Sequence, residues 1–313
     1  MLTHHAPSTV QQKEPQPWPH EMDVDRMNPA PRIFKEGAFV QPHIDKQQRV
    51  TVAARIRNLL NAVAGYTITN LTSMAAFVLF RILNRTKTYG RNKVGQERNT
   101  LILANHRTMI DSYLIGHLTS WPWSLLKPYV LPYHPAAEEN FYRNKVIGWF
   151  SARWKCLPVR RGVRDFRALA MMTEALPSSH MVIFPEGGRS RTGELLRGRP
   201  GTGKLIRDTH CKAVPCYVRG MNNVLPIGKA RPRLFNKISL IFGNPISFDD
   251  LYALPDCKET SQKFIDRVMD HVATLRDELD AIEAAQEQRR RARRTNIQRI
   301  VGLPAQLLRR ISS

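Results

Sequence analysis

Cysteine is scarce in this sequence, and its arrangement argues against two classes of stabilising site. Four cysteines are scattered over 313 residues, at positions 156, 211, 216 and 257. They lack the CxxC spacing of zinc sites, and their density is far below that of a disulfide scaffold. We therefore expect four buried thiols in a reducing compartment and no metal centre. The first residues also lack an apolar stretch behind a basic start, so we expect no secretory signal.

Acidic side chains are also in short supply. The sequence has 26 Asp and Glu against 48 Lys and Arg, which gives a formal net charge of +22. Residues 1–50 are balanced, residues 289–313 hold eight arginines and no acid, and the remaining +14 belongs to the residues between them. Such an excess favours nucleic acid, an anionic lipid surface or a phosphorylated substrate as partner. Basic strands interleaved with aromatics and zinc-finger spacings are absent, so we expect no specific nucleic-acid partner.

Two segments precede the main domain. We expect residues 1–48 to form a disordered arm, because seven prolines and few aliphatic residues leave too little apolar surface to offset the ordering entropy. Residues 49–90 include 23 consecutive uncharged residues, 58–80, which is long enough to span a bilayer. Interspersed Asn, Thr and Ser and basic flanks on both sides fit membrane-associating helices that lie in the interface better. An ordinary pair of core helices is the alternative.

Residues 91–256 have the pattern of an α/β domain. Short apolar runs alternate with helical stretches, which predicts a mainly parallel central sheet covered by helices on both faces. The predicted strands are 101–104, 129–132, 181–184, 213–217 and 238–242, and the main predicted helices are 110–118, 145–152 and 165–175.

The C-terminal part is predicted to be helical and then basic. An apolar stripe runs along residues 257–288, which indicates an amphipathic helix that the arginines at 289–294 should end. Residues 289–313 mix arginines with Ile, Val and Leu, so we expect a tail that lies on an anionic membrane surface. A solvated, partly disordered charge run is the alternative.

One candidate base follows the first predicted strand of the α/β domain. His106 comes directly after the apolar run 101–104, and Asp111 follows five positions later. In a continuous helix the two side chains would lie on different faces, so they can meet only if His106 precedes the helix, with Asn105 as its cap. An Asp bonded to one imidazole nitrogen leaves the other free to take a proton from a hydroxyl. A surface His near a capping Asp is the alternative.

A second cluster follows the apolar run 181–184. It reads Pro-Glu-Gly-Gly-Arg, and it ends in Arg189. Gly187 and Gly188 allow backbone amides to approach an anion, and a guanidinium can bind phosphate through two hydrogen bonds. Glu186 can orient that cation or hold a substrate hydroxyl. A solvated loop between a strand and a helix is the alternative.

These motifs resemble those of the phospholipid and glycerol-phosphate acyltransferase family. NHRTMID at 105–111 is similar to the family's first motif, which contains the catalytic His and Asp. FPEGGRS at 184–190 is similar to its third, with Gly188 where most lysophosphatidate members carry Thr. LPVRRG at 157–162 is similar to the second, whose final Arg, here Arg161, helps hold the acceptor phosphate. Val214-Pro215 resembles the fourth motif, near the acyl site, and the four occur in the family's order.

The resemblance implies a glycerol-phosphate acyltransferase-like fold and direct transfer without a covalent enzyme intermediate. His106, oriented by Asp111, would deprotonate a hydroxyl that attacks the thioester of acyl-CoA or acyl carrier protein, with no cofactor or metal. The implied activity is acylation of 1-acyl-glycerol-3-phosphate in phospholipid biosynthesis, at the cytoplasmic side of a membrane, by a peripheral or monotopic protein. The residues expected to bind the acceptor are Arg161, Glu186, Gly187, Gly188, Arg189 and Lys204.

Three alternatives remain open. The His-Arg pair in the first motif, the double Arg and the string EGGRSRTG resemble the glycerol-3-phosphate branch, whereas the short, single-domain layout is more like the lysophosphatidate branch. An acyltransferase for another lysolipid belongs to the same first alternative. Residues 198–204, GRPGTGK, have the spacing of a phosphate-binding Walker loop, but Leu205 replaces the required hydroxyl and no apolar strand precedes them. A membrane-surface binding protein that has lost catalysis is the third.

Overall fold

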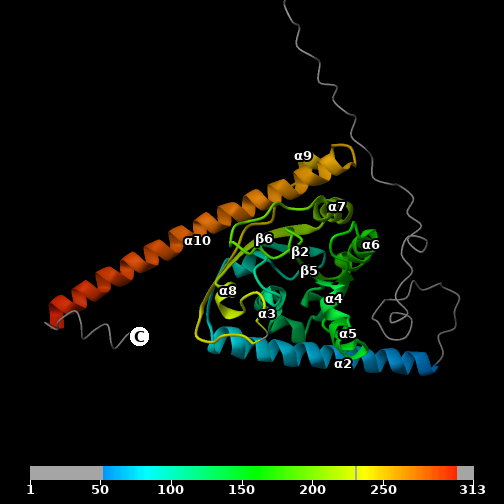
Figure 1. Ribbon diagram of the computed structural model, residues 1–313, viewed down its shortest axis with the longest axis horizontal. Coiled ribbons are helices and arrows are strands. Elements are labelled where there is room, and N and C mark those ends of the chain that lie inside the picture. The colour runs from blue at the N-terminus through cyan, green and yellow to red at the C-terminus, as the bar shows by residue number, and fades with distance from the viewer. Residues whose placement is uncertain (1–51, 230, 302–313) are drawn as a thin grey trace, which may run out of the picture.

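The computed structural model describes residues 52–229 and 231–301, and its centre is a five-stranded sheet (Figure 1). The strand order is β1-β7-β6-β2-β5. β1 pairs in parallel with β7, and β2 pairs in parallel with both β5 and β6, whereas β6 and β7 are antiparallel. The strands are β1 (Arg85–Tyr89), β2 (Thr100–Ala104), β5 (His180–Ile183), β6 (Lys212–Arg219) and β7 (Lys237–Phe242).

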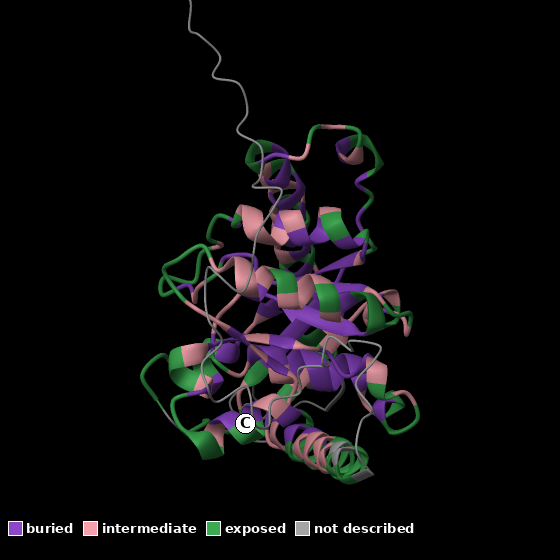
Figure 2. Ribbon diagram, turned by 90° about the vertical axis from the view of Figure 1, so that its right-hand side faces the viewer, coloured by how far each residue is buried: buried purple, intermediate pink, exposed green. Residues whose placement is uncertain are grey.

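Helices cover both faces of this sheet, because its central strands are apolar on both sides. Leu101 and Leu103 of β2 face one buried cluster, and Ile102 and Ala104 face the other. The first cluster includes α6 (Phe166–Ala175), α7 (Pro200–Thr209) and α10 (Lys258–Val301); the second includes α2 (Val52–Phe77), its π-helical continuation η2 (Val78–Ile82) and α3 (Asp111–Ser120). Figure 2 shows the buried strands in purple between helices whose outer sides are exposed. The predicted α/β class with a mainly parallel sheet is confirmed.

Short elements complete the domain. A small parallel sheet, β3 (His134–Ala137) with β4 (Cys156–Val159), joins the main sheet through a bridge between Tyr133 and Met181. The others are η3 (Arg91–Lys93), η4 (Trp123–Leu125), η5 (Pro128–Val130), α4 (Glu138–Phe141), α5 (Lys145–Arg153), η6 (Leu176–Ser178), α8 (Met221–Val224) and α9 (Asp249–Tyr252). The four cysteines are buried and free, as expected.

The predicted strands agree with β2, β5, β6 and β7 to within two residues, but the strand predicted at 129–132 is wrong and β1 was not predicted. Residues 129 and 130 belong to the 3-10 turn that begins at Pro128, residues 131 and 132 are in no helix or strand, and the strand begins only at His134. The sequence also gives little sign of β1, Arg-Thr-Lys-Thr-Tyr, because this edge strand pairs on one side only and needs no apolar run.

The ends of the chain differ from the prediction as well. The arginines at 289–294 do not end the last helix, since α10 has 44 residues and runs from Lys258 to Val301. Arginine is a strong helix former, these side chains are exposed, and Arg291 pairs with Glu287 one turn away at 3.1 Å. Residues 1–51 and 302–313, which include the predicted arm and the end of the tail, lie outside the described residues.

The glycine-rich run 198–204 packs helices and does not form a phosphate loop. Residues from Pro200 onward are the first turns of α7. A Cβ at Gly203 would lie 1.8 Å from the carbonyl oxygen of Ser261, and one at Gly198 would lie 2.7 Å from Ile265, both on α10. These glycines are therefore needed for close approach of α7 and α10, which excludes the Walker-loop interpretation.

Candidate active site

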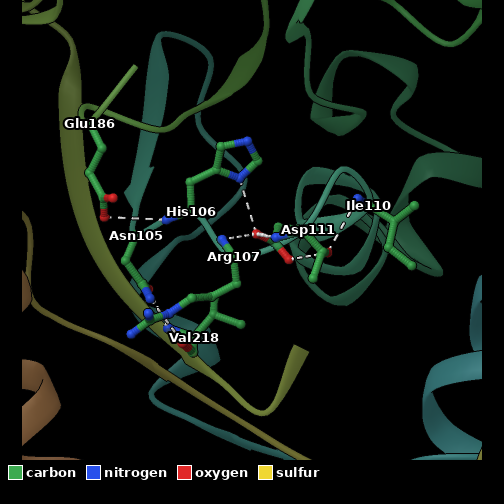
Figure 3. Close-up of polar contacts among 8 residues, drawn as sticks. Asn105, His106, Arg107, Ile110, Asp111, Glu186 and Val218 are labelled. Atoms are coloured by element: carbon green, nitrogen blue, oxygen red, sulfur yellow. Dashed lines mark hydrogen bonds and ion pairs between the residues drawn. The ribbon is translucent and has the colours of Figure 1, made fainter. Parts of the chain in front are cut away.

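The candidate base lies in the turn between β2 and α3 (Figure 3). Nδ1 of His106 is 3.1 Å from Oδ2 of Asp111, the first residue of α3. The same oxygen accepts the backbone N–H of Arg107 at 2.6 Å and that of Thr108 at 2.7 Å, and the Thr108 hydroxyl donates to Oδ1 at 2.6 Å. The helix thus begins at the carboxylate and leaves the histidine in the preceding turn, as the five-residue spacing required.

This network fixes which imidazole nitrogen carries the proton. The carboxylate of Asp111 is fully buried and already accepts three hydrogen bonds, so Nδ1 must be the ring donor in the fourth. The lone pair then lies on Nε2, which has no hydrogen-bond partner among the described residues. The His106 side chain is 15% exposed. Such a ring can take a proton from a hydroxyl that enters the site.

Asn105 has a different place from the one predicted. Its side chain does not cap α3; it is buried, donates to the carbonyl of Val218 at 3.0 Å and accepts the N–H of Val218 at 2.7 Å. The amide therefore extends the pairing of β2 with β6 by one residue beyond Ala104. The N-cap residue of α3 is Ile110, which makes no side-chain capping bond, and the side chains of Asp111 and Thr108 order the turn that precedes the helix.

A second loop holds the imidazole against the sheet. The ring of His106 stacks on Phe184, with centroids 4.0 Å apart and planes 8° from parallel. The carbonyl of His106 accepts the N–H of Ser190 at 3.1 Å, and its own N–H donates to Oε1 of Glu186 at 3.3 Å. Because β2 and β5 are parallel neighbours, the loops at their carboxyl ends meet at the same edge of the sheet.

Glu186 supports the histidine backbone and does not reach the substrate space. Its side chain is only 4% exposed, and it lines neither cavity that borders His106 within the described residues. Its Oε2 is buried without a protein partner in the part of the chain that the structure describes. Burial raises the pKa of this carboxyl from 4.5 to about 7. Among the described residues Glu186 contacts the His106 backbone and not Arg189, and its expected part in substrate binding stays a prediction.

The paired glycines, Gly187 and Gly188, differ in whether the structure leaves room for a side chain. Gly187 has a φ of 65°, and a Cβ there would lie 2.6 Å from Cδ of Arg199. A Cβ at Gly188 would lie in open space, so packing does not require a glycine at this position. Both line the larger cavity, and their backbone can approach a ligand there.

A cavity of about 820 Å³ borders His106, and a smaller one of about 50 Å³ borders the same ring. Arg161 lines both cavities and Arg189 lines the smaller one, so imidazole and guanidinium groups face one space. Arg161 comes from the loop after β4, and its Nε is 3.3 Å from Oε1 of Glu139, with both side chains about half exposed. The larger cavity has an apolar wall that includes Val159, Phe166, Leu169, Met172 and Ile183.

Comparison with known proteins finds a family whose sequence pattern matches the part of the chain that contains this site. The family described as Acyltransferase matches residues 85–219, from β1 to the end of β6. This range contains His106, Asp111, Arg161 and Arg189. Residues 85–219 thus match the acyltransferase family in sequence. The resemblance noted from the sequence motifs is thereby confirmed.

Two individual proteins are similar to the chain. Tafazzin of Drosophila melanogaster is 24% identical over 227 residues, which cover 66% of this chain and 58% of Tafazzin. The solved structure titled 1-acyl-sn-glycerophosphate (LPA) acyltransferase, PlsC, from Thermotoga maritima has a TM-score of 0.49 and 21% identity, covering 70% of this chain and 83% of PlsC. The chain thus spans little more than half the length of Tafazzin.

The remaining predicted residues of the acyltransferase domain lie apart from this space. Lys204 does not line either cavity formed by the described residues; its Nζ is 2.6 Å from Asp208 and 2.7 Å from Asp256, so it ties α7 to the segment before α10. The prediction that it adds charge to the acceptor pocket was wrong. Val214 and Pro215 are buried inside β6. Across residues 52–229 and 231–301 no group of three His, Cys, Asp or Glu could hold a metal.

The sequence motifs did not indicate two residues that support His106 and Asp111. Thr108 binds the carboxylate of Asp111 through both its N–H and its hydroxyl, and a Thr three residues before the Asp is a usable signal for such a turn. Phe184 supplies the surface on which the imidazole lies, although as the last apolar residue after β5 it resembled an ordinary core position.

Proposed function

We propose that this protein transfers a fatty acyl group from acyl-CoA or acyl carrier protein to the hydroxyl of 1-acyl-glycerol-3-phosphate, a step of phospholipid biosynthesis. The observation that carries the proposal is the shared space beside His106, which Arg161 and Arg189 also line. An alcohol whose anionic end is bound by these guanidinium groups would have its hydroxyl within reach of the base.

The proposed chemistry is a direct displacement. Nε2 of His106 accepts the hydroxyl proton as the acceptor oxygen bonds to the thioester carbonyl carbon, and Asp111 stabilises the imidazolium that forms. The tetrahedral species then loses its thiolate, which takes the proton from the imidazolium and leaves as free thiol. The C–O bond replaces the C–S bond, and no step as written needs a metal or a prosthetic group.

The charges favour an acceptor that carries phosphate. Arg189 makes no ion pair with the described residues, and the partner of Arg161, Glu139, is half exposed. An exposed pair of this kind contributes little, about 0–1 kcal/mol, so a phosphate can replace the carboxylate at small cost. Guanidinium groups are suited to such an anion because they can donate two parallel hydrogen bonds.

The larger cavity suits the acyl part of the donor. Its volume of about 820 Å³ is within the range of pockets for large organic ligands, and one wall is built from aliphatic and aromatic side chains of β4, α6 and β5. Cationic groups also border it, namely Arg160, Arg161, Arg164, Arg199 and Lys258. An amphipathic thioester matches this combination of apolar wall and positive rim.

The test is a thiol-release assay with purified protein, acyl-CoA and a panel of acceptors. We expect release with 1-acyl-glycerol-3-phosphate, weaker release with a zwitterionic lysolipid, and loss of at least about 10³-fold in His106→Ala with the fold intact. Faster release with glycerol-3-phosphate would reassign the acceptor. Thiol release in the His106→Ala variant close to that of the unmodified protein would refute the mechanism.

A matched pair of arginine variants tests the phosphate contact. Arg189→Ala should raise the KM for the acceptor by about ten- to a hundredfold, corresponding to about 1.5–3 kcal/mol for a hydrogen bond to a charged group. Arg98→Ala removes an equal charge from an exposed position beside Ser178, outside both cavities, and should leave that KM unchanged. Equal effects of the two substitutions would show that Arg189 acts only through overall charge.

A further inference from the structure

Two side chains in the smaller cavity beside His106 carry polar groups that the fold does not use. Ser112, the second residue of α3, is 9% exposed, and His134, the first residue of β3, is 7% exposed. Both line this cavity. Neither the hydroxyl of Ser112 nor the ring nitrogens of His134 have a hydrogen-bond partner in the part of the chain that the structure describes. Buried polar groups normally have partners, so two such groups in one cavity indicate a ligand that supplies them.

The positions of these two side chains are set by other contacts. Ser112 is placed by α3, one residue after Asp111. His134 is held in β3, where its backbone N–H donates to the carbonyl of Lys155 at 3.0 Å. Its ring lies against Tyr113, with centroids 5.4 Å apart. The hydroxyl and the ring nitrogens are therefore not needed for packing, and burying them without partners lowers the stability of the fold.

Both groups are uncharged, which restricts what they can bind. Burial, with the ammonium group of Lys155 nearby, lowers the pKa of His134 from 6.5 to about 3, so the imidazole is neutral at neutral pH. Among the described residues that line the smaller cavity there is no Asp or Glu, so a choline or ethanolamine group would find no carboxylate. A serine hydroxyl and a neutral imidazole N–H can both donate a hydrogen bond to an uncharged oxygen.

The size of the cavity matches the glycerol part of the proposed acceptor. A volume of about 50 Å³ has room for about four water-sized groups, because one water needs about 10–15 Å³. The proposed function places the acceptor phosphate at Arg161 and Arg189 and the reacting hydroxyl at His106. The oxygen on the remaining glycerol carbon then has no partner, and Ser112 and His134 are the unused polar groups of the same cavity.

We propose that Ser112 and His134 form a subsite for the third oxygen of the acceptor glycerol, which is the ester of 1-acyl-glycerol-3-phosphate. The hydroxyl and the imidazole N–H donate hydrogen bonds to this ester. Contacts to the phosphate, the reacting hydroxyl and the ester together decide which hydroxyl reaches the base and which mirror image of the acceptor is accepted. An acceptor without the third oxygen leaves the two groups unpaired and is disfavoured. The subsite rests on the proposed function, which supplies the other two contacts.

The experiment compares two water-soluble acceptors in the thiol-release assay with acyl-CoA and the full chain. The first is 1-hexanoyl-glycerol-3-phosphate, which carries the ester. The second is 2-hydroxydecyl phosphate, which has the same chain length, phosphate and reacting hydroxyl but no ester. We expect Ser112→Ala and His134→Phe each to lower kcat/KM for the ester by about three- to tenfold and for the analogue by less than about twofold. Intrinsic differences between the acceptors cancel, because the same pair is compared in every variant.

Ser120→Ala is the matched control, since it removes a buried hydroxyl from the same helix at a position outside this cavity. It should leave the ratio of the two kcat/KM values unchanged. Thermal unfolding adds a measurement that separates binding from structure. Ser112→Ala and His134→Phe should be at least as stable as the unmodified protein, because each removes a buried group that has no partner in the fold.

The outcomes keep a failure of the subsite distinct from a failure of the proposed function. Equal losses of kcat/KM for the two acceptors in Ser112→Ala would overturn the subsite and leave the proposed function standing. A selective loss in only one of the two variants would overturn the role of the other residue. If the unmodified protein released no thiol with any acceptor, the proposed function would fail and the subsite with it.

Discussion

Replacing Asp111 with Asn should reduce the proposed activity much less than replacing the base, His106, with Ala. The backbone N–H groups of Arg107 and Thr108 both point at the oxygen that His106 contacts, so an amide at this position must turn its oxygen toward them. The amide nitrogen then faces the Thr108 hydroxyl, which can accept instead of donate. Nδ1 of His106 therefore keeps an acceptor, and the lone pair stays on Nε2.

The magnitude follows from the charge that is lost. Two unit charges 3.1 Å apart attract by about 5 kcal/mol at an effective dielectric constant of about 20. The remaining neutral hydrogen bond retains about 1 kcal/mol of this attraction. If the proton is half transferred at the transition state, the loss is about 2 kcal/mol, which lowers kcat about thirtyfold. An amide that presented its nitrogen to the ring would instead cause a loss of about 10⁴-fold, because the wrong tautomer would form.

The assay is thiol release at saturating acyl-CoA and acceptor, compared among the unmodified protein, Asp111→Asn and His106→Ala. We expect Asp111→Asn to lie clearly between the other two, with an unchanged far-UV circular dichroism spectrum. A kcat for Asp111→Asn as low as that for His106→Ala would refute the argument that the two backbone donors decide the orientation of the side chain.

Three further predictions concern stability. Burial raises the pKa of the Glu186 carboxyl from 4.5 to about 7. The contribution of this carboxyl to the free energy of unfolding should therefore be full below about pH 4.5 and lost as the pH rises through about 7. Urea unfolding at several pH values should show that the free energy of unfolding depends less on pH in Glu186→Gln. Gly187→Ala should destabilise the fold by about 1–2 kcal/mol in thermal unfolding because φ is 65°, whereas Gly188→Ala should be neutral, and equal effects would contradict the geometry. Asn105→Ala should cost about 2–4 kcal/mol in chemical unfolding, since it leaves a buried N–H and C=O of β6 unpaired; a loss below about 1 kcal/mol would mean that they find other partners.

The sequence predicts most of the sheet because the central strands are buried on both faces. β2 and β5 read as continuous apolar runs, and such runs are informative wherever a strand has no solvent side. β1 is the opposite case, since an edge strand with exposed Arg85 and Lys87 leaves no apolar signal. The end of α10 was missed for a related reason: the arginines that indicate a terminus are also good helix formers when they are solvated.

The candidate site was predictable where short spacing carries the geometry. His106 and Asp111 are five residues apart, so the two side chains meet when a strand ends just before His106 and a helix begins at Asp111. Lys204 could not be placed from the sequence, because a lysine in a glycine-rich run gives no sign of its ion-pair partners. Only the fold brings Asp208 and Asp256 to it. The orientation of Glu186 could not be predicted either, since nothing in its motif reveals that the side chain turns inward to the His106 backbone.

The hydrogen bond between the carbonyl of His106 and the N–H of Ser190 joins the loops that follow β2 and β5. The imidazole of His106 and the guanidinium of Arg189 are therefore both carried by the main sheet. Arg161 lies in the loop after β4 of the small sheet, which joins the main sheet through the bridge between Tyr133 and Met181. If the proposed function is correct, changes in the small sheet would therefore alter the binding of the acceptor by Arg161 and leave the contact between His106 and Asp111 in place.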